Sequence, residues 1–178
     1  MRTICAVFFA LILLLPAAAQ KNKRDPLTQA EQDQIAEAGI APVDRLDLYV
    51  KFLNQHADTI EGVAKRAHTP ARAHRMDDEL EDFSALMDEM SSNLDVYADR
   101  KADIRKSMKG MTESIARWQS MLKSIPKEPG FEVSLQDAID SSSDLAAQAK
   151  QVNTDQDAYF KAHPDQKGQD RAEPNNSQ

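Results

Sequence analysis

Apolar residues recur at alternating steps of four and three over residues 76–125, the longest regular pattern in the chain. We call the positions of this series the seam, and Lys101 is the only polar residue among them. Such spacing keeps one side of a helix facing a partner helix, so it predicts a coiled-coil-like α-helix. The apolar seam positions are Met76, Leu80, Phe83, Met87, Met90, Leu94, Tyr97, Ile104, Met108, Met111, Ile115, Trp118, Leu122 and Ile125.

Four helices are predicted within one helical domain, residues 28–162. Thr28 and Glu31 have the spacing of a capping box, which marks the start of the first helix. Thr69 followed by Pro70 is a typical start for the third, and residues 127–130 form a turn before the last. We expect Ser134 to cap that last helix. The expected helices cover residues 28–38, 43–67, 70–125 and 132–162.

The fold class is therefore all-α, and two geometries are open for residues 70–125. In the first, they form one long continuous helix, along which the other helices fold as an elongated antiparallel hairpin or bundle. In the second, the chain bends within residues 95–101, near Lys101, and the two halves close into a compact four-helix bundle. We favour the continuous helix because neither Gly nor Pro lies between Leu94 and Ile104.

The two ends of the chain have a different composition from the helical domain. Residues 1–19 combine Arg2, an apolar run and a small-residue cleavage pattern, which is typical of a secretory signal peptide. The apolar run is too short to span a membrane, and no later segment could replace it. We expect residues 20–27 to be a basic leader and residues 163–178 a disordered polar tail. The sequence thus predicts an exported protein, periplasmic or secreted.

Composition excludes several classes of function. The one cysteine, Cys5, lies within the predicted signal, so thiol catalysis and zinc–thiolate sites are not expected in the processed chain. The net charge of −7 disfavours nucleic acid and anionic lipid as partners. No Gly-rich phosphate loop or nucleophile–base pair is recognisable, and we expect neither catalysis nor a cofactor.

The charges along residues 70–125 fall into two blocks. Residues 77–99 contain acidic residues and no Lys or Arg, whereas residues 100–127 are mainly basic. A helix dipole acts only near the helix ends and does not account for blocks of this length. We therefore expect the acidic last helix to pack on the basic block, and a protein partner or a second copy to be recognised. The predicted interaction residues are Arg100, Lys101, Arg105, Lys106 and Lys109.

Two groups of residues could bind metals. His74, Asp78 and Asp82 recur at steps of four, and an imidazole with carboxylates can hold a divalent ion. The alternative is an acidic helix face in contact with solvent. Methionines gather on the seam, where they can form the core, bind a soft metal, or provide a surface for client proteins. Core packing is the interpretation we favour.

Two resemblances accompany these patterns. The segment 27–32 (LTQAEQ) is similar to the Leu-Thr-x-x-Gln motif of the Spy/CpxP-type periplasmic chaperones, with Glu31 in place of the motif glutamine. Segments 45–53, 99–106, 116–119 and 159–164 resemble exported helical proteins of acidobacterial genomes that have no assigned activity. The second resemblance implies an all-helical layout and no particular activity.

These observations favour an exported, non-catalytic helical protein that acts through protein–protein contacts in a structural or adaptor role. One alternative is a chaperone-like protein that binds clients on exposed methionine and leucine grooves. The other is a metal-binding helical protein.

Overall fold

A computed structural model describes residues 25–168 of the chain, and all of its regular elements are helical. Predicted helices at the two ends of the domain agree with the structure to within a residue or two. Thr28 caps the first helix through a complete capping box, and the Thr69 side chain caps the third. The elements are α1 (Gln29–Glu37), α2 (Pro42–Ala64), α3 (Pro70–Asp99), α4 (Arg105–Ser124), α5 (Glu132–Ala162) and the 3₁₀ helix η1 (Pro164–Gln166).

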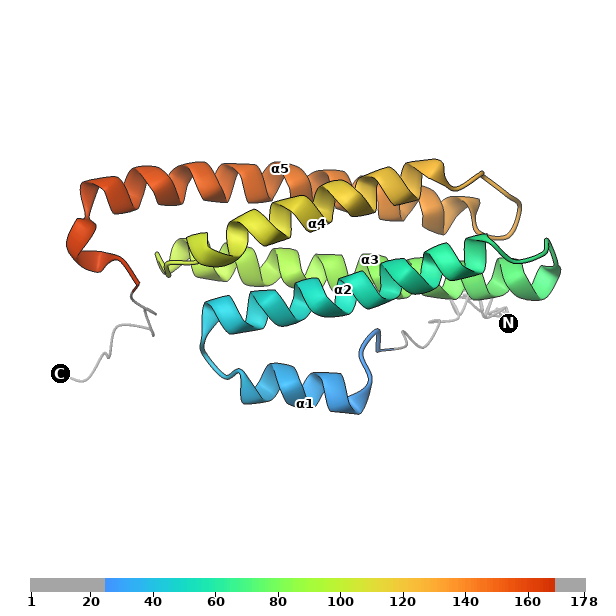
Figure 1. Ribbon diagram of the computed structural model, residues 1–178, viewed down its shortest axis with the longest axis horizontal. Helices are drawn as coiled ribbons and strands as arrows, with labels where there is room; N and C mark the ends of the chain where they lie inside the picture. Colours follow the sequence, from blue (N-terminus) through green and yellow to red (C-terminus); the bar gives the residue numbers. More distant parts are fainter. Residues whose placement is uncertain (1–24, 169–178) are drawn as a thin grey trace, which may run out of the picture.

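Helices α2 to α5 form an elongated four-helix bundle, and α1 lies outside it along α2 (Figure 1). Two antiparallel hairpins, α2–α3 and α4–α5, are joined by residues 100–104. Helix α3 packs against α2 and α5, and α4 also packs against α2 and α5. Helices α3 and α4 therefore lie diagonally across the core, and α3 is parallel to its neighbour α5. The all-α bundle predicted from the sequence is confirmed.

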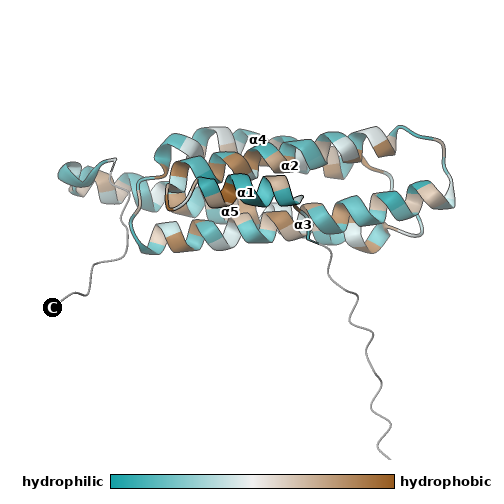
Figure 2. Cartoon of the chain, turned by 90° about the horizontal axis from the view of Figure 1, so that it is seen from below, coloured by the Kyte–Doolittle hydropathy of each residue, from teal (hydrophilic) through white to brown (hydrophobic). Residues whose placement is uncertain are grey.

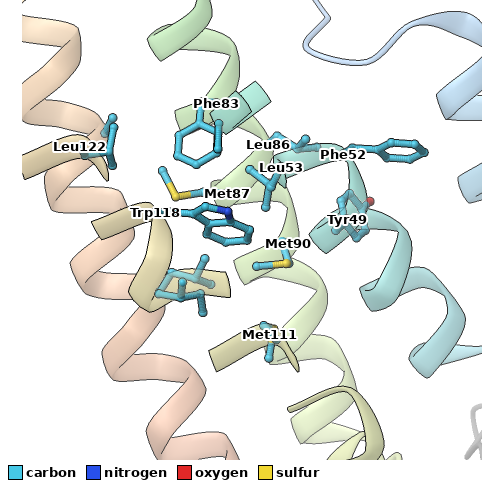
Figure 3. Packing of buried hydrophobic residues seen from close by; sticks show 14 of the residues in the cluster. Tyr49, Phe52, Leu53, Phe83, Leu86, Met87, Met90, Met111, Trp118 and Leu122 are labelled. Carbon is cyan, nitrogen blue, oxygen red and sulfur yellow. The ribbon is translucent and has the colours of Figure 1, made fainter. Parts of the chain in front are cut away.

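The core is built from the seam positions of the sequence pattern. All fourteen apolar seam residues are buried, from Met76 on α3 to Ile125 after α4. Trp118 lies at the centre, where its ring meets that of Phe83 edge to face at 5.7 Å (Figure 3). Hydrophobic positions form bands separated by hydrophilic ones along the helices, as expected for amphipathic bundle helices (Figure 2). Helix association thus accounts for the four-three spacing.

The prediction of one continuous helix over residues 70–125 is wrong, because the chain turns back after Asp99. Lys101 has a φ of 55°, in the left-handed region. The amide of Ala102 donates to the carbonyl of Tyr97, and that of Lys101 donates to the carbonyl of Ala98. This is a Schellman C-cap with lysine where glycine is usual. The turn folds α4 back so that its seam is buried in a shared core. In one continuous helix, part of that seam would be exposed.

A buried glutamine of α5 supports this turn. The Gln156 side chain donates to the Ala102 carbonyl at 2.6 Å and accepts from the Ile104 amide at 3.1 Å. Gln156 is 4% exposed, so these backbone groups have little access to water. Leaving either group without a partner would cost about 1–3 kcal/mol. The break between α3 and α4 is therefore stabilised by a residue more than fifty positions later in the chain.

At the opposite end of the bundle, Arg72 links the two hairpin loops. Its guanidinium donates to the carbonyls of Val63 and Ala64, the last residues of α2. It also pairs with Glu128, in the α4–α5 loop, at 2.7 Å. Arg72 is buried and lies over the Phe131 ring. A charge in such a position is stable only when paired, so the two loops depend on each other.

The structure also corrects the predicted limits of order. Gln166 accepts a hydrogen bond from the Tyr159 hydroxyl, and the Gly168 amide donates to Asp103. Residues 163–168 therefore do not belong to a disordered tail. Near the N-terminus, Leu27 is buried and so belongs to the folded domain. The predicted signal, residues 1–19, and residues 20–24 and 169–178 lie outside the described part. Among residues 25–168, no helix is both long and apolar enough to cross a membrane.

Candidate interaction groove

An open groove of about 820 Å³ runs between α3 and α5. Both walls carry carboxylates, and none of the residues lining the groove is Lys, Arg or His. Ser84, Ala85, Val133, Ser134 and Ser141 complete the lining. Clefts lined by a single sign of charge concentrate the electrostatic field. The lining carboxylates are Asp77, Asp78, Glu81, Asp82 and Asp88 of α3, and Asp137, Asp140 and Asp144 of α5.

Hydrogen bonds at both ends of the groove set its register. Ser134 donates to Asp77 at 2.6 Å, and Ser91 donates to Gln148 at 2.9 Å. Both pairs are separated by 57 positions, so α3 and α5 run parallel without slippage over this length. The same offset puts Asp144 within one residue of the level of Asp88. Ser134 is therefore not the predicted cap, because α5 already begins at Glu132. Its side chain instead donates to Asp77 of the groove.

The expectation that α5 packs on the basic block holds only in part. Helix α5 does pack against α4, but it packs equally along the acidic α3. Some of the basic charge of α4 is directed toward α2 instead. Arg117 pairs with Asp58 at 3.1 Å and donates to Asn54. The acidic residues of α3 and α5 thus share one face of the bundle, which the charge-block argument did not anticipate.

The predicted interaction residues surround the α3–α4 turn, and the fold already uses some of them. Arg105 forms a bidentate pair with Asp103, which holds the pKa of that carboxyl below its usual range. Its guanidinium also lies 4.5 Å from the centre of the Phe160 ring. Lys101 lies over Tyr159, and Arg100 over Tyr97. Lys106 and Lys109 are exposed on α4. Arg100, Lys101 and Arg105 thus contribute to contacts within the fold, and the recognition of a partner by these five residues stays a prediction.

The candidate metal residues do not converge on a common point. His74 Nε2 lies 3.8 Å from Asp78 Oδ2, and the His74 side chain is 77% exposed. Asp82 belongs to the lining of the groove. Within the described residues, no set of three or more His, Cys, Asp or Glu side chains is placed to hold a metal ion.

The methionines of the seam, and Met121 beside it, are core residues. Met76, Met87, Met90, Met108, Met111 and Met121 are all buried. The client-binding alternative needs exposed methionine or leucine grooves, and the large hydrophobic residues exposed in the part of the chain described are Ile40, Val96 and Val133. None of these three is methionine or leucine, so the described residues provide no exposed groove of the kind that this alternative needs.

The spacing of the acidic residues indicates the two walls of the groove, although the net charge of each block does not. Asp137, Asp140 and Asp144 are spaced by three and four, which puts them on one face of α5. Glu81 and Asp88 have a similar spacing on α3. The net charge of the segment indicates that α3 is acidic. It does not indicate which face of the helix the carboxylates share. The pairing of the two faces depends on the bundle topology, and the sequence pattern contains no direct sign of it.

Known proteins provide no template for this groove. No protein-family model, curated protein or solved structure matches the chain. The residues of the groove, their register and their charge are thus the basis for a function.

Proposed function

We propose that this chain is an exported, non-catalytic helical protein that acts by binding another protein. Its acidic groove between α3 and α5 receives a basic segment of that partner. The observation that carries this proposal is the single sign of charge along both walls of the groove. Export is inferred from the pattern of residues 1–19.

Two physical arguments support a binding role for the groove. Neighbouring carboxylates on α3 and α5 repel one another, so their arrangement costs stability that neutral side chains would not. Asp88 and Asp144, which the register puts within one residue of the same level, are both exposed to solvent. A basic segment would relieve this repulsion and form charge-assisted hydrogen bonds with the carboxylates. Complementary charge also speeds association and selects between partners.

A direct test is the binding of a fluorescent decapeptide rich in lysine and arginine, measured by anisotropy at 0.15 M salt. The variant Asp88→Asn/Asp137→Asn/Asp144→Asn removes three groove carboxylates. We expect it to weaken binding by about tenfold or more, because each carboxylate lost removes a charge-assisted contact.

The control has the same net charge but an intact groove. Glu37, Asp47 and Glu113 are exposed carboxylates on α1, α2 and α4. The variant Glu37→Gln/Asp47→Asn/Glu113→Gln should bind the peptide within about twofold of the parent chain at this ionic strength. Equal losses in the two variants would show that the peptide responds to overall charge, and the groove would lose its role.

A further inference from the structure

Helix α2 carries an apolar stripe that faces away from the centre of the bundle. Leu48, Phe52 and His56 follow one another at steps of four, which puts them on one face of the helix. The buried residue Leu53 points toward Trp118, whereas Phe52 points away from it (Figure 3). Phe52 is nevertheless 1% exposed, and Leu48 is partly buried. Something outside the four-helix bundle must therefore cover this stripe.

The cover is the N-terminal segment, residues 25–38. Its helix α1 packs on α2 and on no other helix of the described chain (Figure 1). Leu27 and Ile35 are both buried in the same hydrophobic cluster as Phe52. Lys51 adds a hydrogen bond to Gln34 at 3.1 Å. A helix of nine residues is not stable alone in water, so α1 depends on these contacts.

His56 connects this segment to the bundle at the end of the stripe. Its Nδ1 lies 3.2 Å from Glu79 Oε2, and its Nε2 lies 3.2 Å from the carbonyl oxygen of Pro26. Both of these oxygens are acceptors, and only the protonated ring has two N–H donors. The geometry therefore fits the imidazolium form. A neutral ring can donate to one of these oxygens and must leave the other without a hydrogen bond from the ring.

The charged groups that act on the ring come from α3. Glu79 is in contact, Asp82 adds a second negative charge, and Arg75 holds the remaining oxygen of Glu79. The N-terminal segment contributes the uncharged Pro26 carbonyl. The positive ring thus faces a carboxylate on one side and the N-terminal segment on the other.

We propose that protonation of His56 controls the docking of residues 25–38. The charged ring holds this segment over Leu48 and Phe52, and the neutral ring lets the segment detach. Detachment would expose an apolar surface on α2 that the closed form hides. This device is separate from the acidic groove, and it holds whether or not the groove binds a basic partner.

The direction of the pH response follows from the environment of the ring. Burial alone lowers the pKa of His56, but the hydrogen bond and charge of Glu79 outweigh it and raise the pKa above its ordinary value. Glu79 stays beside the ring when the segment detaches, whereas the hydrogen bond to the Pro26 carbonyl, which favours the charged ring, is lost. We expect this loss to outweigh the relief from burial, so that the detached form has a lower His56 pKa than the closed form. Docking is therefore fully stabilised below the ordinary histidine range and weakens as the pH rises through the raised value.

The test is hydrogen exchange by mass spectrometry on peptides covering residues 29–38, corrected for the intrinsic pH dependence of exchange. From pH 5.5 to pH 8.5 we expect the opening of this segment to increase about threefold to tenfold. In His56→Gln the segment should be equally open at both pH values. His74→Gln, which removes an exposed histidine, should behave as the parent chain does.

A second measurement does not depend on any variant. The pKa of the His56 ring, measured by NMR in the parent chain, should coincide with the midpoint of segment opening. A midpoint elsewhere, or a pH response retained in His56→Gln, would overturn the proposal that His56 protonation controls the docking of this segment.

Discussion

At the scale of single residues, the turn between α3 and α4 shows what a sequence pattern can and cannot reveal. Lys101 stands out as the one polar seam position, and it marks the break in the pattern. Neither Gly nor Pro accompanies it, so local propensity favours a continuous helix. The break depends on the hydrogen bonds of Gln156, a residue distant in sequence. Interactions at that separation cannot be predicted from helix propensity or periodicity.

Replacing Lys101 with glycine should stabilise the protein. The left-handed conformation costs a residue with a side chain about 1–2 kcal/mol, and glycine avoids that cost while losing more entropy on folding. We expect a net gain of about 0.5–1 kcal/mol and an increase of roughly 1–4 °C in the thermal midpoint. Calorimetry at neutral pH would measure it.

The matched control is the same substitution within a helix. Lys150 is exposed in the middle of α5, so Lys150→Gly should destabilise the protein by about 1 kcal/mol. Equal destabilisation by the two glycine substitutions would show that the left-handed conformation of Lys101 costs the folded protein little.

At the scale of elements, local signals were sufficient for most of the helices. Thr28 and Thr69 are caps whose side chains act within three residues, and both were recognised from sequence alone. Pairing between helices was harder to predict, since it depends on topology. The charge blocks suggested where α5 would pack, but the diagonal placement of α3 and α4 brought α5 against both of them.

Helix α4 contains an interior glycine with no packing role in the described structure. A Cβ added at Gly110 would meet no atom within 4 Å. Gly110→Ala should therefore raise the free energy of unfolding by about 1 kcal/mol, through helix propensity. Chemical denaturation monitored by circular dichroism would detect this increase.

Gly130 provides the contrasting case, in the α4–α5 loop. Its φ is 103°, and an added Cβ would lie 3.3 Å from the Cβ of Ala73. Gly130→Ala should destabilise the protein for both reasons.

For the prediction on α4, an unchanged or lower stability in Gly110→Ala would indicate that this helix is distorted near residue 110.

At the scale of the whole molecule, like charges on neighbouring helices should limit stability at low salt. The variant Asp88→Asn/Asp137→Asn/Asp144→Asn, which weakens peptide binding in the proposed function, should then unfold at a higher temperature. We expect a gain of about 0.5–1.5 kcal/mol at 10 mM salt, and a smaller gain at 1 M salt because salt screens the repulsion. Thermal melts at the two salt concentrations would provide the comparison.

Asp103→Asn serves as the opposite case. This carboxylate is paired with Arg105 and accepts from Gly168, so its loss should destabilise the protein. A triple groove variant that melted like the parent chain at low salt would show that the groove carboxylates do not repel one another appreciably.

The diagonal placement of α3 and α4 also has a consequence for biosynthesis. The α2–α3 hairpin is complete once Asp99 has been made, but its seam can be covered only by α4 and α5, which are translated later. We expect the growing chain to keep an open apolar face until nearly all of α5 has left the ribosome. For the export proposed above, such a delay in closing the core would favour passage of the unfolded chain through a translocation pore.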